Sequence, residues 1–183
     1  MCIRDRVYPQ GFTGETITNA IAEYEKTLIT PNSPFDRYLK GDENAISENA
    51  KKGYRLFLKL GCQTCHTGPA MGGQSFEYAD LKGDLFSGRA KTNDDNGLMN
   101  FTKKETDKHR FRVPTLRNVE LTWPYMHDAS AQTLEEAITK MYHYQLGYDK
   151  LDKNEVRLLV AFLKTLTGEY QGKPVQGEVC PAP

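Results

Sequence analysis

The sequence lacks a long apolar stretch. The longest uninterrupted apolar run extends only from Leu158 to Leu163, whereas a helix needs about 20 apolar residues to cross the hydrocarbon core of a bilayer. The sequence therefore predicts no membrane span. At 183 residues, of which 38% are hydrophobic, the chain is long and apolar enough to form the core of a globular domain.

The sequence also lacks an excess of charge of either sign. The 24 lysines and arginines balance 24 aspartates and glutamates, so the formal net charge is zero. Proteins that bind nucleic acid or anionic lipid usually carry concentrated positive charge, and no block of like charge stands out here. We therefore expect neither nucleic acid nor a membrane surface as a partner.

A set of cysteines suited to a disulfide framework is missing as well. The chain has four cysteines, and Cys2 and Cys180 lie near its opposite ends. The other two belong to the motif Cys62-Gln63-Thr64-Cys65-His66. This distribution points to chemistry at one motif and not to a disulfide-stapled fold.

The Cys-x-x-Cys-His motif is typical of covalent haem attachment. Each thiol can add to one vinyl group of the haem, and the adjacent histidine then becomes an axial ligand of the iron. A redox dithiol needs no histidine and usually lies in a βαβ context. A zinc site needs a second ligand pair, which His109 and His127 offer only at a spacing unlike that of a zinc finger. The motif predicts one haem c on Cys62 and Cys65, with His66 bound to the iron.

The second axial ligand is left open by the residues alone. A methionine is more often a packing residue than a ligand. Met141 is favoured because it lies on the apolar face of a predicted helix, which can hold a thioether in place. The candidates are Met71, Met99, Met126, Met141, His109, His127 and His143.

Helical periodicity predicts a mostly α fold. Apolar residues recur at helical spacing over four segments, with end signals such as the Thr133…Glu136 pair and Gly168. Residues 30–36 contain two prolines and predict an extended connector. The 67–130 segment has little periodicity, and a loop of that length is unusual unless it is functional or wraps a cofactor. The four predicted helices cover residues 16–28, 47–60, 133–145 and 152–166.

The amino terminus has no secretion signal. Residues 1–6 are followed by no apolar segment and no small-residue cleavage site. Because a c-type haem is attached outside the cytoplasm, we expect a periplasmic protein of which this chain is a fragment. We also expect residues 1–6 to be a cloning or sequencing remnant.

Many ordered segments resemble the bacterial di-haem cytochrome c peroxidases. The resemblance extends from about Val7 to Gly168 and includes the haem motif. Its further segments are AIAEYEKTL (20–28), TPNSPFD (30–36), FRVPTLRNV (111–119), LTWPYMHD (121–128), LEEA (134–137), QLG (145–147) and AFLKTLTG (161–168).

The resemblance implies one half of a two-domain enzyme. In these peroxidases an N-terminal haem reduces hydrogen peroxide, and a C-terminal high-potential haem receives electrons from a small cytochrome or copper protein. This chain resembles the second half, so it would contain no catalytic residue of its own, and the N-terminal haem domain would be missing. A homodimer is also implied. The expected division is a non-native or disordered tail (1–7), an inter-domain helix and connector (8–46), a cytochrome c-like haem domain (47–171) and a C-terminal tail (172–183).

The resemblance also assigns residues to the site. It implies Met141 as the second iron ligand, carbonyls of Thr122 and Pro124 as calcium ligands between the two domains, and His127 near the haem. The related methylamine-utilisation enzymes use a tyrosine where Met141 stands, but Tyr142 is turned by about 100° on the helix. Arg112 and Arg117 could pair with haem propionates, because guanidinium binds carboxylates bidentately. The alternatives are a mono-haem electron carrier and a fragment of a methylamine-utilisation-type enzyme.

Overall fold

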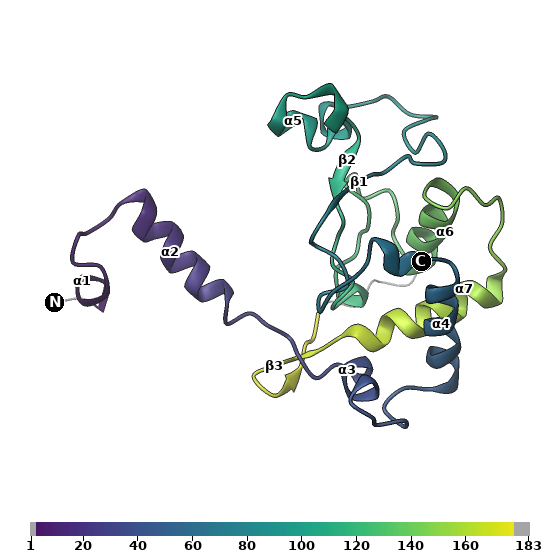
Figure 1. Cartoon of the computed structure of the whole chain (residues 1–183), viewed down its shortest axis with the longest axis horizontal. Coiled ribbons are helices and arrows are strands. Elements are labelled where there is room, and N and C mark those ends of the chain that lie inside the picture. Colours follow the sequence, from purple (N-terminus) through teal and green to yellow (C-terminus); the bar gives the residue numbers. More distant parts are fainter. Residues whose placement is uncertain (1–2, 178–183) are drawn as a thin grey trace.

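The computed structural model describes residues 3–177 and is mostly helical (Figure 1). No helix within this range is long and apolar enough to span a membrane. The α-helices are α1 (Ile3–Val7), α2 (Gly14–Glu25), α3 (Pro34–Leu39), α4 (Glu48–Lys59), α5 (Met99–Thr102), α6 (Leu134–Tyr144) and α7 (Lys153–Leu163). Short 3-10 helices are η1 (Cys62–Thr64), η2 (Asn93–Asn96), η3 (Glu105–Asp107), η4 (Val119–Leu121) and η5 (Lys164–Leu166). The strands are β1 (Phe76–Tyr78), β2 (Arg110–Arg112), β3 (Glu169–Tyr170) and β4 (Lys173–Pro174).

Polar caps begin the three helices of the haem domain close to where the sequence predicted them. Ser47 accepts a hydrogen bond from the Ala50 amide at the start of α4 (3.2 Å), and Asp152 does the same for α7. Thr133 caps α6, but Glu136 binds the Gln132 amide and not that of Thr133. The predicted reciprocal box is therefore displaced by one residue.

Helix α3 begins inside residues 30–36, which were predicted to be an extended connector, and continues to Leu39. Ser33 accepts from the Asp36 amide and Asp36 accepts from the Ser33 amide, which forms a capping box. Pro34 occupies the first turn, where its missing N–H costs nothing. The prediction was wrong because these prolines were interpreted as helix breakers, whereas one of them begins a helix.

The core lies where α4 crosses α7. A β-carbon at Gly53 would overlap the backbone carbonyl of Leu158, so only glycine allows this close approach. The fully buried Phe162 contacts aromatic rings of α3 and α4, with ring centroids 5.0 to 5.3 Å apart. Its partners are Phe35, Tyr54 and Phe57.

The long segment between α4 and α6 contains short elements and little regular structure. Strands β1 and β2 pair antiparallel, with Phe76 opposite Arg112. The segment then returns to the helical core, where Asn118 binds the Gly168 amide through its side chain (2.9 Å). Much of this segment is therefore held by turns and side-chain hydrogen bonds.

Both ends of the described chain are more regular than the sequence predicted. Residues 3–7 form α1, where a tail was expected, and residues 173–174 form β4, which pairs with β3. Residues 1–2 and 178–183 of the predicted tails lie outside the described range. In Figure 1, α1 and α2 stand apart from the helical core. These helices and the loop between them expose Val7, Phe12, Ile17 and Ile21.

Candidate haem site

The haem motif follows directly on α4. Gly61 adopts a left-handed conformation (φ 79°) that ends the helix, and η1 then turns the chain through Cys62. Cys62 and Cys65 are partly buried free thiols. Burial raises the pKa of Cys62 to about 11 and also raises the pKa of Cys65. A redox dithiol needs a thiolate at neutral pH, so this environment does not favour redox-dithiol chemistry.

His66 is held in the tautomer that a metal ligand requires. Its Nδ1 lies 3.3 Å from the carbonyl oxygen of Met71, and because a carbonyl only accepts, Nδ1 carries the hydrogen. Burial lowers the pKa of His66, so the ring is neutral at neutral pH. The lone pair of Nε2 is then available to a metal, as in histidine ligands that are oriented by a backbone carbonyl. The donor set of the motif therefore fits a covalently bound haem.

A glycine turn supports the carbonyl that orients His66. Gly72 has φ 134°, and a β-carbon there would overlap the Pro114 carbonyl oxygen. The Gly73 amide donates to Val113 O at 2.7 Å. The turn after Met71 is thus packed against residues 113–115, which fixes the position of the Met71 carbonyl.

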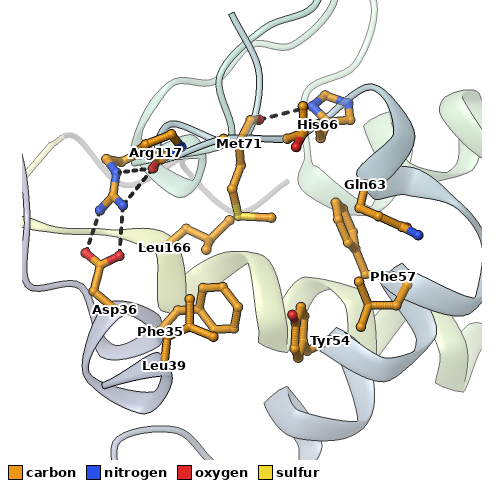
Figure 2. Close-up of a pocket in the computed structure, with 14 residues that line it drawn as sticks. Phe35, Asp36, Leu39, Tyr54, Phe57, Gln63, His66, Met71, Arg117 and Leu166 are labelled. Carbon is orange, nitrogen blue, oxygen red and sulfur yellow. Dashed lines mark hydrogen bonds and ion pairs between the residues drawn. The ribbon is translucent and has the colours of Figure 1, made fainter. Parts of the chain in front are cut away.

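A pocket of about 280 Å³ adjoins the motif (Figure 2). Residues of α3 and α4 form its apolar walls, and Gln63 lies at its edge. Figure 2 shows the Met71 side chain reaching into this pocket, whereas the His66 ring is directed away from it. His66 and Thr67 of the haem-motif segment also contribute to the lining of the pocket. Its walls include Phe35, Tyr54, Phe57, Met71 and Leu166.

Met71, one of the candidates for the second iron ligand, lies beside His66. Its backbone binds Nδ1 of His66, and the two ring nitrogens point away from each other. Met141 lies on α6, partly buried and on the same face as the buried Leu134 and the core-packed Ile138. Its role as iron ligand stays a prediction.

Arg117 ties the connector to the loop after the haem motif. Its guanidinium binds the Asp36 carboxylate through two bonds of 2.8 and 2.9 Å. Its remaining N–H groups donate to the carbonyls of Thr30 and Pro69. All five donors are thereby used, which speaks against the predicted propionate contact. Arg112 donates through Nε to Gly73 O and is exposed, so its predicted propionate contact stays a prediction.

His127 belongs to a buried polar cluster that the sequence did not reveal. Its Nε2 lies 2.7 Å from Asp95, which is 1% exposed and also binds Arg89. The ring of Phe111 covers the imidazole at 4.6 Å between centroids. The Arg89 guanidinium holds the pKa of the Asp95 carboxyl well below its usual range. His127 is therefore hydrogen-bonded within the protein, and its predicted proximity to the haem stays a prediction.

The remaining candidates take varied positions. Thr122 and Pro124 are exposed just after η4, and their calcium role stays a prediction. His109 binds Asp80 at 2.7 Å, and Nδ1 of His143 lies 3.3 Å from Tyr148 O. Within residues 3–177 no group of three or more histidine, cysteine or acidic side chains could hold a metal ion.

Two family models match the chain in succession. Residues 4–44 match the di-haem cytochrome c peroxidase family, and residues 50–167 match the cytochrome c family. The resemblance inferred from the sequence and the mostly α cytochrome c-like fold are thus confirmed.

Individual relatives agree with the family matches. A cytochrome c peroxidase of Escherichia coli is 54% identical over 164 residues, covering 90% of this chain and 35% of the relative. A cytochrome c551 peroxidase of Nitrosomonas europaea is 48% identical over 157 residues, covering 86% of this chain and 46% of the relative. The chain thus spans between a third and a half of the length of these relatives.

A solved structure supports the same grouping. The crystal structure of a MauG-like protein associated with microbial copper homeostasis superposes with a TM-score of 0.70 at 28% identity, over 91% of this chain and 61% of that one. The chain therefore belongs to the cytochrome c family, in the group that contains the bacterial di-haem cytochrome c peroxidases.

Proposed function

We propose that this chain is the electron-accepting haem domain of a periplasmic di-haem cytochrome c peroxidase. The parent enzyme would reduce hydrogen peroxide to water with electrons from a small redox protein. The main support is the Cys62-x-x-Cys65-His66 motif, in which Nδ1 of His66 is bound to the Met71 carbonyl so that Nε2 is available to iron. The two family matches in sequence order support the same proposal.

Each site residue has a defined task in this proposal. Cys62 and Cys65 would form the two thioethers, His66 would supply a nitrogen ligand and Met141 would supply a sulfur ligand to the iron. When bound, the haem supplies a reversible one-electron iron couple. A thioether ligand favours the ferrous state, so Met141 would raise the reduction potential relative to a second histidine.

The electron count divides the work between two halves. Reduction of one hydrogen peroxide to two waters consumes two electrons and two protons. This domain would hold one haem and pass electrons singly to the missing N-terminal half, where peroxide would react.

Calcium binding is a separate part of the proposal. Thr122 and Pro124 are exposed, and we propose that their backbone carbonyl oxygens bind a calcium ion at the junction of the two halves. A homodimer of the parent enzyme is a further part of the proposal.

Haem attachment tests the proposal directly. After co-expression with c-type haem maturation factors, the wild-type chain should give a pyridine haemochrome spectrum and stain for haem on a denaturing gel. Cys62→Ala and Cys65→Ala should each weaken or abolish the stain, since each thioether anchors one vinyl group. Unchanged staining in both variants would contradict the assignment.

The identity of the second ligand has its own test. Met141→His should lower the reduction potential markedly, because axial ligands set haem potentials over a range of about 0.8 V. Met141→Leu should remove the ferric sulfur-to-iron absorption band. Met71→Leu and Met126→Leu serve as controls and should keep it. Loss of the band in Met126→Leu but not in Met141→Leu would make Met126 the ligand.

Turnover assays separate this domain from a complete enzyme. The haem-loaded chain should show negligible peroxidase activity with a reduced cytochrome donor, since the peroxide-reducing haem would be missing. Robust turnover would place the catalytic centre in this chain. An upstream reading frame with a second Cys-x-x-Cys-His at the encoding locus would distinguish a peroxidase half from a stand-alone mono-haem carrier.

A further inference from the structure

The turn that follows the haem motif has an unfavourable backbone conformation. Met71 has φ 50°, and the next two residues, Gly72 and Gly73, have φ 134° and 84°. Glycine adopts such values at little cost, but a residue with a β-carbon does not. Contacts from outside the turn are therefore needed to hold Met71 in this conformation. The carbonyl oxygen of Met71 is the group that accepts the hydrogen bond from Nδ1 of His66.

Three successive carbonyl oxygens of this turn accept hydrogen bonds from residues 116 and 117. The Leu116 amide lies 3.2 Å from the carbonyl oxygen of Ala70 and 3.1 Å from that of Met71. The Arg117 amide lies 3.3 Å from the same Ala70 oxygen. The Arg117 side chain donates through Nε and Nη2 to the carbonyl oxygen of Pro69, at 3.2 and 2.9 Å. Arg117 thus holds the turn through both its backbone and its side chain.

The other edge of the Arg117 guanidinium contacts the connector (Figure 2). Nη1 and Nη2 bind the two carboxylate oxygens of Asp36 at 2.8 and 2.9 Å, and Nη1 also donates to Thr30 O at 2.9 Å. Asp36 is itself fixed, because it accepts from the amide of the buried Ser33 at the start of α3. The carboxylate is therefore a fixed support for the guanidinium.

The connector is also held by contacts that do not involve this guanidinium. The side-chain amide of Asn118 donates to the hydroxyl of Thr30 at 2.9 Å. The Glu169 amide donates to the carbonyl oxygen of Pro31 at 2.7 Å. Loss of the guanidinium should therefore leave the connector in place and release mainly the turn after the haem motif.

We propose that Arg117 is a positioning residue for the iron ligand His66. The inference rests on the proposed function. With Asp36 as its support, the guanidinium holds the Pro69 carbonyl. The turn thereby places the Met71 carbonyl against Nδ1 of His66. A hydrogen bond from Nδ1 to a carbonyl increases the basicity of the imidazole as a ligand.

The expected consequence is a change in the iron couple. A more basic nitrogen ligand favours ferric over ferrous iron, and hydrogen bonds to the ligands are among the means by which a protein tunes a haem potential. Arg117 therefore keeps the reduction potential below the value that a loosely held turn would give. The residue acts through His66 and not by contact with the haem.

The forked shape of the guanidinium is essential to this role. Nη2 binds Asp36 and the Pro69 carbonyl at once, so one planar group fixes the separation of these two acceptors. A lysine ammonium is a compact point charge on a flexible stem and does not reproduce this arrangement. Arg117→Lys therefore keeps the charge and loses the link between the connector and the turn.

Two variants of the haem-loaded chain test the inference without changing its net charge. They are Arg117→Lys and the double variant Arg117→Gln with Asp36→Asn, which replaces an ion pair by a neutral pair. Both should raise the reduction potential, measured by spectroelectrochemical titration. In the ferrous protein, the NMR signal of the His66 Nδ1 proton should exchange with solvent about tenfold faster or more than in the wild type, because its acceptor is less firmly held.

Arg37→Lys is the matched control on the same helix as Asp36. The Arg37 guanidinium donates to Asn32 O at 3.1 Å and lies 3.7 Å from Glu169. The change alters a contact of the connector itself, and it should leave the potential and the proton exchange at their wild-type values. Changes as large as those of Arg117→Lys would indicate a general loosening of the connector and would overturn the inference.

The remaining outcomes separate the positioning role from the proposed function. Haem content is measured first, by the pyridine haemochrome spectrum, and a wild-type chain that binds no haem would overturn the proposed function itself. Full haem content with wild-type proton exchange in both Arg117 variants would overturn only the positioning role, even if their thermal stability falls. A potential at or below the wild-type value in both variants would do the same.

Discussion

The helical frame, formed by α3, α4 and α7, and the segment of residues 67–131 that follows the haem motif are held together in different ways. Helices α3, α4 and α7 pack through a cluster of aromatic rings around Phe162, with the backbones of α4 and α7 in close approach at Gly53. The 67–131 segment has few buried apolar side chains and depends on polar contacts such as Asp95 with Arg89 and Asp80 with His109. Burial therefore stabilises the frame, whereas specific hydrogen bonds order the segment.

This difference matters for the site because both regions contribute to it. The frame supplies the end of α4, from which the haem motif begins. The segment supplies the Met71 carbonyl that orients His66, and Gly72 packs this turn against Pro114. A haem attached to the cysteines after α4 would thus depend for its histidine ligand on the 67–131 segment, which has few buried apolar side chains.

The largest expected effect comes from the helix crossing. Gly53→Ala should destabilise the protein by about 3 kcal/mol or more, because the added methyl group overlaps backbone of α7 and both helices must move apart. Chemical denaturation followed by circular dichroism measures the change. Gly14→Ala, in the first turn of α2 with open space around it, is the matched control and should be neutral. Equal effects at the two positions would show that the crossing does not limit stability.

A smaller effect is expected from the polar cluster of the 67–131 segment. Asp95→Ala should cost about 2 kcal/mol, because Arg89 and His127 lose a buried charged partner. Limited proteolysis should cut the segment sooner while α4 and α7 stay protected. Asp94→Ala, at the exposed neighbouring position, should leave both measurements unchanged. Equal protection of the segment in the Asp95 and Asp94 variants would contradict this role of the cluster.

The smallest expected effect is a change in acid stability. Hydrogen bonds from Arg89 lower the pKa of Asp95, and those from Arg117 lower the pKa of Asp36. A carboxyl with a lowered folded-state pKa stabilises the fold above its unfolded value of about 3.9, and this contribution is lost as the pH falls further. Stability should therefore be flat near neutral pH and decline below about pH 4. The decline should be shallower in Asp95→Asn than in Asp94→Asn; identical profiles would show that Asp95 does not contribute.

The parts of the fold that were predictable are those coded by local contacts. Ser47, Thr133 and Asp152 bind amides only two or three residues away, so the starts of α4, α6 and α7 can be read from short patterns. Helix α3 carried the same kind of information in its Ser33…Asp36 box, but its Pro34 was interpreted as a break. Local signals thus existed for most helices, and the error arose from their interpretation.

In the candidate site, too, some features could be predicted from local sequence and others could not. The chemistry of Cys62, Cys65 and His66 follows from their spacing in the sequence, whereas the orientation of His66 depends on a glycine turn packed against residues 113–115. The Asp36–Arg117 pair joins residues 81 positions apart, and the Asp95–His127 contact joins residues 32 positions apart. No pattern in one sequence specifies which distant charges will meet.

The sequence by itself determined the haem motif, the family resemblance and the main helices, because each depends on residues close together in the chain. Only the tertiary structure decided that Arg117 binds the connector, that His127 pairs with the buried Asp95, and that the Met71 carbonyl contacts His66. The physical reason is that burial and pairing at these positions arise when segments far apart in the chain come into contact. The free energy of such a contact depends on neighbouring residues that a local sequence pattern does not specify.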